Sequence, residues 1–436
     1  MGMGLVAIIS FDVVDLFFVA QLGDAPLAAI SFTFPVIWLI SSIIIGFEAG
    51  AASCISRAVG RNDTVRARRQ TTDTVALAGL VSLSLSIVGL LTIYPLFRML
   101  GATDELLPLV NDYMGTWYWS APASAITWTC LASIRARGNS LLEGKIIALA
   151  ALLNAVLDPL LIFGLLGFPR LGIAGAALAT LLASGTAMVG TLIYLHVNLR
   201  IFATPFTTIS NVLDSWRQML QVGFPAMLTN AIVPISNGVA VAMIAGYGVD
   251  AVAGYGVAVR IEPIALIAFY ALSAVTSPFM GQNFAAGKVD RLESARLVIG
   301  RFCAAYGLCI AVVLVSLATP IAGLFTDTAA IQQVSVDYLR IMAISYGGYG
   351  MVMSTCAAFN GVGYPIPGLI ISMSRAVFIF LPLAILGRSL IGLNGIFFAA
   401  ATSNILIGVF GYLWLGRNIR RVKSGLRPGL SRRGAR

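Results

Sequence analysis

Three polar residues stand in long apolar stretches, and their side chains are suited to binding a cation. Asp15 lies inside the apolar run 2–22, and Asn154 and Asp158 lie inside the run 144–166. Asn154 and Asp158 are four residues apart, so a helix would place both on one face. Carboxylate and amide oxygens accept cations, and a carboxylate also accepts a proton. We therefore predict that these three residues form a site for H⁺ or Na⁺.

Such a site would respond to a change of its bound cation. Two carboxylates in a medium of low dielectric constant repel each other, and a proton or Na⁺ shared by Asp15 and Asp158 would relieve that repulsion. Protonation would then repack the first helix and change what a neighbouring cavity can hold. Pro159 also frees a backbone carbonyl near Ala155, which could bind a cation or a water molecule. The alternative is a structural polar cluster that hydrogen-bonds neighbouring helices together.

The elements that hold these residues must be membrane helices. The chain has 436 residues, of which 58% are hydrophobic and only 11% are charged, and its mean hydropathy is +0.91. Because a soluble domain carries about 25% charged residues, this chain needs lipid as its solvent. Since a spanning helix needs roughly 20 apolar residues, the length predicts an all-α integral membrane protein with about twelve transmembrane helices. No basic segment precedes the first apolar run, so we expect no cleavable signal peptide.

The apolar runs give the positions of these helices, and short loops with Gly, Pro, Asn and Asp separate them. We predict helices over 2–22, 28–52, 72–96, 112–134, 144–166, 171–196, 219–241, 252–278, 297–320, 334–358, 366–387 and 392–416.

Basic residues gather in alternate loops and in the tail 417–436. The loop residues are Arg57, Arg61, Arg66, Arg68, Arg69, Arg135, Arg137, Lys145, Arg200, Arg217, Lys288, Arg291, Arg296 and Arg301. This positive-inside pattern predicts a multi-pass protein of the cell (inner or plasma) membrane with both termini in the cytoplasm. It also explains the net charge of +10 without a nucleic-acid partner, because the basic tail can contact anionic lipid.

The two halves of the chain resemble each other. Gly60-Arg-Asn-Asp recurs as Gly287-Lys-Val-Asp, and Thr129-Cys-Leu-Ala recurs as Thr355-Cys-Ala-Ala. An even number of helices in each half predicts two six-helix lobes related by a pseudo-twofold axis along the membrane normal, as in secondary transporters that alternate access by rocking. Two complete lobes in one chain make a monomer sufficient. The expected domains are an N-lobe over 1–200, a cytoplasmic linker over 201–218, a C-lobe over 219–416 and the basic tail over 417–436.

Other polar and aromatic residues at membrane depth are candidates for a substrate cavity. Asp12 is three residues before Asp15 and either shares its titration or sits in water. Arg260, Glu262 and Arg375 either form structural ion pairs or line the cavity, because charges at bilayer depth need a partner. Tyr113 and Trp117 belong either to the interfacial aromatic belt or to a surface that binds cationic compounds. Glu48 is interpreted as an interfacial residue paired with a nearby Arg.

The same residues, over nearly the whole chain, resemble the multidrug and toxic compound extrusion (MATE) family. The matching stretches are Val14-Asp15-Leu-Phe-Phe-Val, Ser56-Arg57-Ala-Val-Gly60, Asn154-Ala-Val-Leu-Asp158-Pro159, Leu171-Gly-Ile-Ala-Gly-Ala-Ala-Leu-Ala-Thr180 and Gly281-Gln282-Asn283. The resemblance implies a V-shaped bundle and export of amphipathic, often cationic, compounds driven by H⁺ or Na⁺. In the subgroup with an N-lobe cation site, the positions that carry coupling match Asp15, Asn154 and Asp158, and Thr180 would add a hydroxyl. Another subgroup uses acids in helices 7 and 10, and this chain has none in the matching stretches.

Rival functions remain open at this point. A lipid-linked oligosaccharide flippase or a narrow-substrate metabolite exporter of the same superfamily would share the architecture, and a channel would share the apolar helices. An enzyme is not expected, since the chain has no HExxH, GxSxG or Gly-rich phosphate loop. The single histidine and the five cysteines without CxxC spacing argue against a His- or Cys-based metal site. We expect no cofactor beyond the coupling ion, and a small-molecule substrate and the lipid bilayer as partners.

Overall fold

The computed structural model describes residues 4, 6–7, 15, 17–19, 21–203 and 208–424. All of the regular elements in this part of the chain are helices. The chain divides into two compact units, Met1–Met227 and Leu228–Arg436, each with its own core. Helix α7 (Ile209–Ala245) begins in the first unit and ends in the second.

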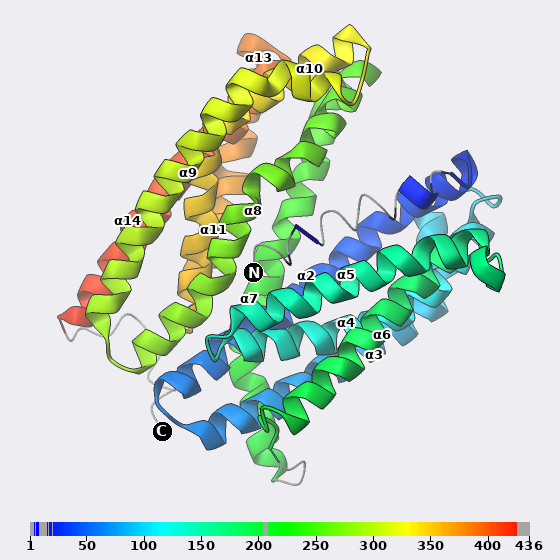
Figure 1. Cartoon of the computed structure of the whole chain (residues 1–436). Coiled ribbons are helices and arrows are strands. Elements are labelled where there is room, and N and C mark those ends of the chain that lie inside the picture. The colour runs from blue at the N-terminus through cyan, green and yellow to red at the C-terminus, as the bar shows by residue number, and fades with distance from the viewer. Residues whose placement is uncertain are drawn as a thin grey trace. The chain divides into compact units, whose positions relative to one another are not determined.

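The first unit is built around one central helix. Its elements before α7 are α2 (Asp24–Gly60), α3 (Thr64–Met99), α4 (Leu107–Arg135), α5 (Ser140–Phe163), the short turn η1 (Leu165–Gly167) and α6 (Ile173–Val197). Helix α4 packs against α2, α3 and α6, and α5 covers α6 (Figure 1). Tyr118 and Met114 of α4 are among the largest fully buried side chains, so α4 supplies much of this core.

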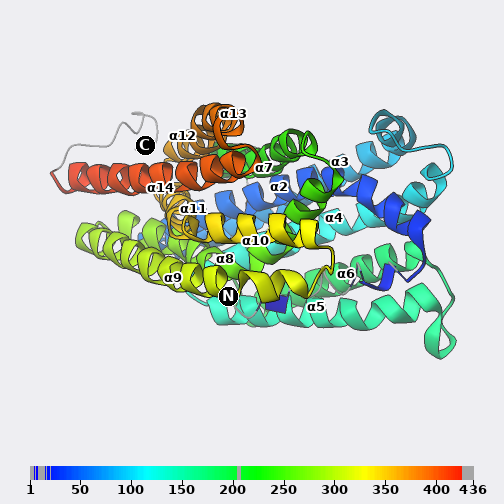
Figure 2. The same ribbon diagram turned by 90° about the horizontal axis from the view of Figure 1, so that it is seen from above.

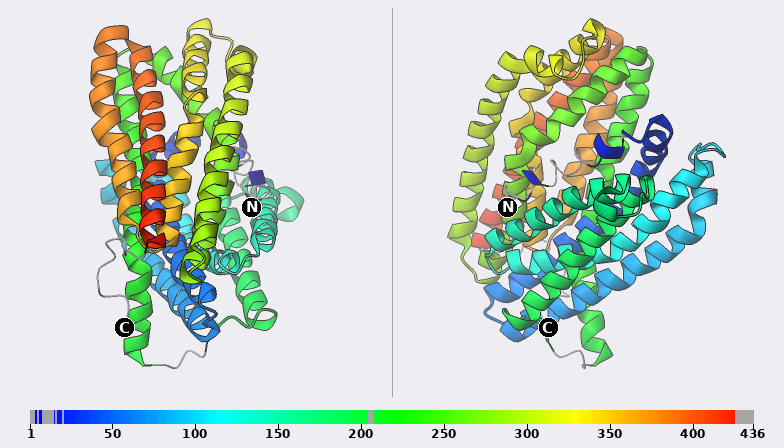
Figure 3. Two further views of the ribbon diagram at one scale, coloured as in Figure 1. Left: turned by 90° about the vertical axis from the view of Figure 1, so that its left-hand side faces the viewer. Right: turned by 45° about the vertical axis from the view of Figure 1, so that its right-hand side comes forward.

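The second unit has a corresponding central helix, α11. Its elements are α8 (Val249–Ala285), α9 (Val289–Gly323), α10 (Ala329–Ala343), α11 (Tyr346–Gly361), α12 (Ile366–Met373), the π-helical segment η2 (Ser374–Ile379), α13 (Phe380–Ile391) and α14 (Leu393–Lys423). Helix α11 packs against α8, α9 and α14. Helices α12 and α13 continue one another beside α14, as Figure 2 shows, and the long helices of this unit run alongside one another in both views of Figure 3.

Nine helices of the described residues are long and apolar enough to cross a membrane. Helix α4 and the pair α10 and α11 are not among these nine, and the predicted first helix falls largely outside the described residues. The helices extend beyond the predicted apolar runs, as α7 does at both ends, because hydropathy marks only the lipid-facing part of a helix.

The prediction of one helix over 334–358 was wrong in detail. The structure has two helices there, α10 and α11, joined by a tight turn at Ile344 and Ser345. The Ser345 hydroxyl donates to the backbone oxygen of Met342 at 2.8 Å and accepts from Asn404 Nδ2 at 3.1 Å. The bond from Asn404 ties this turn to α14, and hydropathy does not register such a contact.

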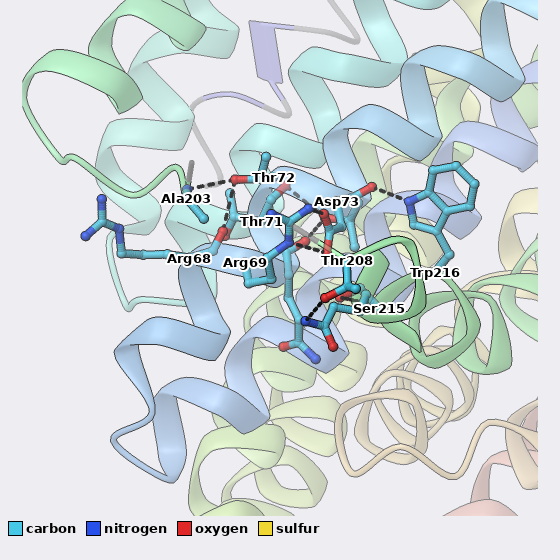
Figure 4. Close-up of polar contacts among 12 residues, drawn as sticks. Arg68, Arg69, Thr71, Thr72, Asp73, Ala203, Thr208, Ser215 and Trp216 are labelled. Atoms are coloured by element: carbon cyan, nitrogen blue, oxygen red, sulfur yellow. Dashed lines mark hydrogen bonds and ion pairs between the residues drawn. The ribbon is translucent and has the colours of Figure 1, made fainter. Parts of the chain in front are cut away.

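Polar contacts fasten the segment after α6 and the start of α7 to α3 (Figure 4). The Arg68 guanidinium donates to the backbone oxygen of Phe202 at 2.8 and 3.2 Å, and the backbone N–H of Ala203 donates to Thr72 Oγ1 at 2.9 Å. Trp216 Nε1 donates to the backbone oxygen of Asp73 at 2.8 Å. The first turns of α7 are therefore anchored within the first unit.

Helix α7 also approaches α2 closely, and glycines make this approach possible. A Cβ atom on Gly50 would lie 2.6 Å from the backbone oxygen of Met219, and one on Gly46 would lie 2.8 Å from the backbone oxygen of Gly223. These distances are shorter than a carbon and an oxygen can approach without a shift of the backbone. The Gly46–Gly50 spacing follows the small-xxx-small pattern that brings membrane helices together.

We expect Gly50→Ala to lower the free energy of unfolding of the detergent-purified protein by about 1–3 kcal/mol, because the added methyl group overpacks a backbone contact. The control is Gly115→Ala in α4, where a Cβ meets nothing within 4 Å. Alanine should raise helix stability there by up to about 1 kcal/mol. Thermal unfolding measured by intrinsic fluorescence compares the two variants. Equal melting temperatures for both would show that the α2–α7 contact is looser than the structure indicates.

Candidate cation-coupling site

The predicted helix-5 residues meet inside the first unit. Asn154 and Asp158 of α5 are 3% and 0% exposed. In the orientation that satisfies both neighbours of its amide, Asn154 donates from Nδ2 to Asp158 Oδ2 at 3.0 Å and accepts from the backbone N–H of Thr180 at 3.0 Å. The Thr180 hydroxyl donates to the backbone oxygen of Ala176 at 3.1 Å. Helices α5 and α6, both long and apolar enough to cross a membrane, thus share one polar cluster.

Asp15 belongs to the same neighbourhood. Its carboxylate interacts electrostatically with that of Asp158. Phe18, three residues later, places its ring against Phe163 of α5 in an edge contact with centroids 6.1 Å apart, and Val19 is completely buried. Phe18 therefore packs on α5 near its C-terminal end.

One oxygen of Asp158 has open bonding capacity. Oδ1 is buried and has no hydrogen-bond partner, whereas Oδ2 lies beside Asn154. A buried carboxylate oxygen without a partner is costly, and a proton or a small cation at Oδ1 would remove that cost. Pro159 has no backbone N–H, so a carbonyl one turn earlier in α5 loses its helical hydrogen bond, and the oxygens open to a cation are those of the Asp158 carboxylate and of this carbonyl. Such oxygens suit H⁺ and Na⁺ alike.

Two other predicted residues of this unit belong to its apolar core. Tyr113 is 5% exposed and belongs to the apolar core around α4, and Trp117 packs partly buried against it. Asp12 lies outside the described residues. Asn139 accepts from the backbone N–H of Leu142 at 3.1 Å and caps the start of α5.

The sequence predicted only part of a second cluster of buried charged residues. Arg135 at the end of α4 forms ion pairs with both Glu48 of α2 and Glu143 of α5, and the side chains are 4%, 15% and 0% exposed. The predicted pairing of Glu48 with an arginine is confirmed. Glu143 was not recognised, although its position eight residues after Arg135, across a tight loop, was the available signal. Two carboxylates share one guanidinium here, so this cluster ties three helices together.

The charged residues of the second unit lie in different surroundings. Arg260 is exposed, whereas Glu262 is half-buried and accepts from the Tyr338 hydroxyl at 3.1 Å. Arg375 is half-buried and donates from Nη1 to Asn404 Oδ1 at 3.2 Å. In the part of the chain that the structure describes, no group of three or more His, Cys, Asp or Glu side chains could hold a metal ion.

Comparison with known proteins gives consistent matches over most of the chain. The MatE family model matches residues 1–160 and 225–386. A protein named FAD transporter from Shewanella oneidensis is 36% identical over 422 residues, which are 97% of this chain and 93% of that protein. The multidrug export protein MepA of Staphylococcus aureus is 24% identical over 419 residues, which are 95% of this chain and 90% of that protein.

Solved structures give the same result. The Vibrio cholerae MATE transporter VcmN in the bent form superposes with a TM-score of 0.91 at 29% sequence identity, covering 98% of this chain and 96% of that one. The likeness to such transporters confirms the predicted class, a fold of twelve transmembrane helices in two lobes.

Proposed function

The chain belongs to the MATE family of membrane transporters, and we propose that it is a secondary active antiporter that exports an organic solute in exchange for H⁺ or Na⁺. The proposed coupling site consists of Asp15, Asn154, Asp158 and Thr180. We further propose that both termini lie in the cytoplasm, as the distribution of Lys and Arg implies.

The observation that carries this proposal is the state of Asp158. A fully buried carboxylate at bilayer depth, with one oxygen unpartnered and a second carboxylate within electrostatic range, has little stability unless it binds a cation. Cation binding would change the charge of the cluster by one unit. Because Phe18, three residues after Asp15, packs on α5, that change would act on a contact between helices, which is what coupling requires.

A flavin dinucleotide is the first candidate for the solute. The FAD transporter of Shewanella oneidensis matches 97% of this chain at 36% identity, well above the 24% of MepA. A dinucleotide combines flat rings with an anionic diphosphate, so its carrier needs aromatic surfaces together with positive charge.

Amphipathic cations are the second candidate. MepA is named a multidrug export protein and matches the chain over almost its full length. An acidic cluster in the first unit could attract such compounds, and aromatic side chains would contact them by cation–π attraction.

The test is transport by the purified protein in liposomes loaded with either FAD or ethidium. Inward gradients of H⁺ and of Na⁺ are imposed separately, and release of the solute is followed by fluorescence. We expect one gradient to accelerate release of one solute at least severalfold over protein-free liposomes, which identifies both the coupling ion and the solute class. Release of both solutes at a rate independent of either gradient would contradict antiport and favour a passive pathway.

A further inference from the structure

Arg375 occupies an unusual place in the second unit. It lies in η2, the π-helical segment between α12 and α13, nine residues from the start of the candidate span Ile366–Ile391. Single π-helical turns within α-helices occur often at functional sites. An arginine at this depth is costly and is normally retained for a role.

The guanidinium is held by neutral neighbours. Nη1 donates to Asn404 Oδ1 at 3.2 Å, and Asn404, which is 2% exposed, donates in turn to Ser345 Oγ at 3.1 Å. The Arg375 Cζ atom lies 4.8 Å from the centroid of the Tyr349 ring. Residues of α11, α14 and the turn before α11 therefore fix the orientation of the guanidinium without neutralising its charge.

Most of the hydrogen-bonding capacity of Arg375 is unused. A guanidinium has five N–H donors, and only the one from Nη1 is engaged; Nε is buried and has no partner. Among the described residues, no Asp or Glu carboxylate lies within 4.0 Å of Arg375. In the same unit, the Tyr346 hydroxyl is also buried and without a partner.

Glu262 is the negative charge that interacts electrostatically with Arg375, but its carboxylate forms no ion pair or hydrogen bond with the guanidinium. Its carboxylate accepts from Tyr338 instead. An oriented guanidinium with free donors and no bound carboxylate matches the fork geometry by which arginine binds carboxylate and phosphate groups.

We propose that Arg375 is an anion-binding residue that receives a phosphate or carboxylate group at the free Nη2 end of its guanidinium. This assignment rests on the proposed function, because the anion would belong to the exported solute. A phospholipid headgroup offers the same phosphate chemistry and is the second source that the experiment must distinguish.

Binding by the full-length protein in detergent micelles, without any ion gradient, tests the site. The probes are FAD and riboflavin, which share the isoalloxazine ring but differ in the diphosphate, with inorganic pyrophosphate as a competitor. We expect Arg375→Gln to weaken FAD binding roughly tenfold or more and to leave riboflavin binding unchanged, since charged hydrogen bonds to phosphate are strong. Pyrophosphate should displace FAD from the wild type.

Two further variants sharpen the result. Arg388→Gln is the matched control, because Arg388 also stacks on a tyrosine ring, that of Tyr247 at 5.6 Å, but is exposed; its FAD binding should equal that of the wild type. Glu262→Gln removes the charge that opposes an anion and should tighten FAD binding. This variant also keeps the test decisive if Arg375→Gln does not fold.

Nanodiscs distinguish the two sources of phosphate. If phosphatidylglycerol competes with FAD and Arg375→Gln abolishes that competition, the site also accepts lipid phosphate. If the wild type does not bind FAD but retains phosphatidylglycerol in an Arg375-dependent way, the anion is a lipid. FAD binding that is equal in the wild type, Arg375→Gln and Glu262→Gln would overturn the proposal, as would a wild type that binds neither FAD nor phosphatidylglycerol. Loss of transport with intact Arg375-dependent binding would instead refute only the antiport mechanism.

Discussion

Asp158→Asn should abolish gradient-driven release of solute from loaded liposomes, down to the rate of protein-free liposomes. The amide has nearly the same size as the carboxylate and can still accept from Asn154 Nδ2, so the packing of α5 should persist. It carries no titratable charge, however, and offers a cation one neutral oxygen in place of a carboxylate. The measurement is release under the H⁺ and the Na⁺ gradient, with thermal unfolding as the check on folding and solute binding in detergent as a separate readout.

The control for this variant is Asp112→Asn, because Asp112 lies in the same unit on α4 but is exposed. It should transport at the wild-type rate. Release by Asp158→Asn that still follows the gradient would exclude Asp158 as the coupling residue. Equal loss of solute binding and of transport would assign Asp158 to the solute site instead.

Arg135→Met should lower the free energy of unfolding more than Gly50→Ala or Arg98→Met does. Removing the guanidinium leaves Glu48 and Glu143 buried without a countercharge, and breaking one partner of a buried ion pair costs about 3–5 kcal/mol in free energy of unfolding. Lowering the pH should reduce this loss, because protonation removes the two uncompensated negative charges. Thermal unfolding of the purified variant at several pH values measures both effects.

The matched control is Arg98→Met, which breaks the pair between Arg98 and Asp104, whose side chains are 67% and 83% exposed. Exposed pairs contribute about 0–1 kcal/mol, so this variant should unfold almost as the wild type does. Adding Glu48→Gln and Glu143→Gln to Arg135→Met should restore much of the lost stability. If the triple variant is no more stable than Arg135→Met, the defect comes from packing and not from unpaired charge.

The sequence was sufficient to predict the class of fold and the residues of the polar cluster around Asp158. Apolar runs predict membrane helices because lipid imposes a minimum length of apolar chain. The four-residue spacing of Asn154 and Asp158 places them on one helix face whatever the tertiary structure. Their contact with Thr180 of α6 came from the family resemblance, since no local rule relates residues on different helices.

The contacts of Arg135 show what sequence reasoning missed and why. Glu48 precedes Arg135 by 87 residues, so their pairing depends on how α2 and α4 pack, which neither periodicity nor hydropathy encodes. The turn at Ser345 was missed for a similar reason, since its bond with Asn404 of α14 joins residues that are 59 apart in the sequence. The solute class was also beyond the sequence, because weak contacts along an apolar surface leave no motif.

The π-helical turn at η2 also changes which residues face inward along the span that contains it. Buried residues recur there at every fourth position, at Gly368, Ser372, Ala376, Phe380 and Ala384. In an unbroken α-helix with 3.6 residues per turn, each such step advances the azimuth by about 40°, so four steps would drift by about 160°. One inserted residue takes back about 100° of that drift. A helical wheel drawn through this span as one regular α-helix would therefore turn Phe380 and Ala384 away from the core. The inserted residue keeps one face of the combined helix α12–η2–α13 on the core.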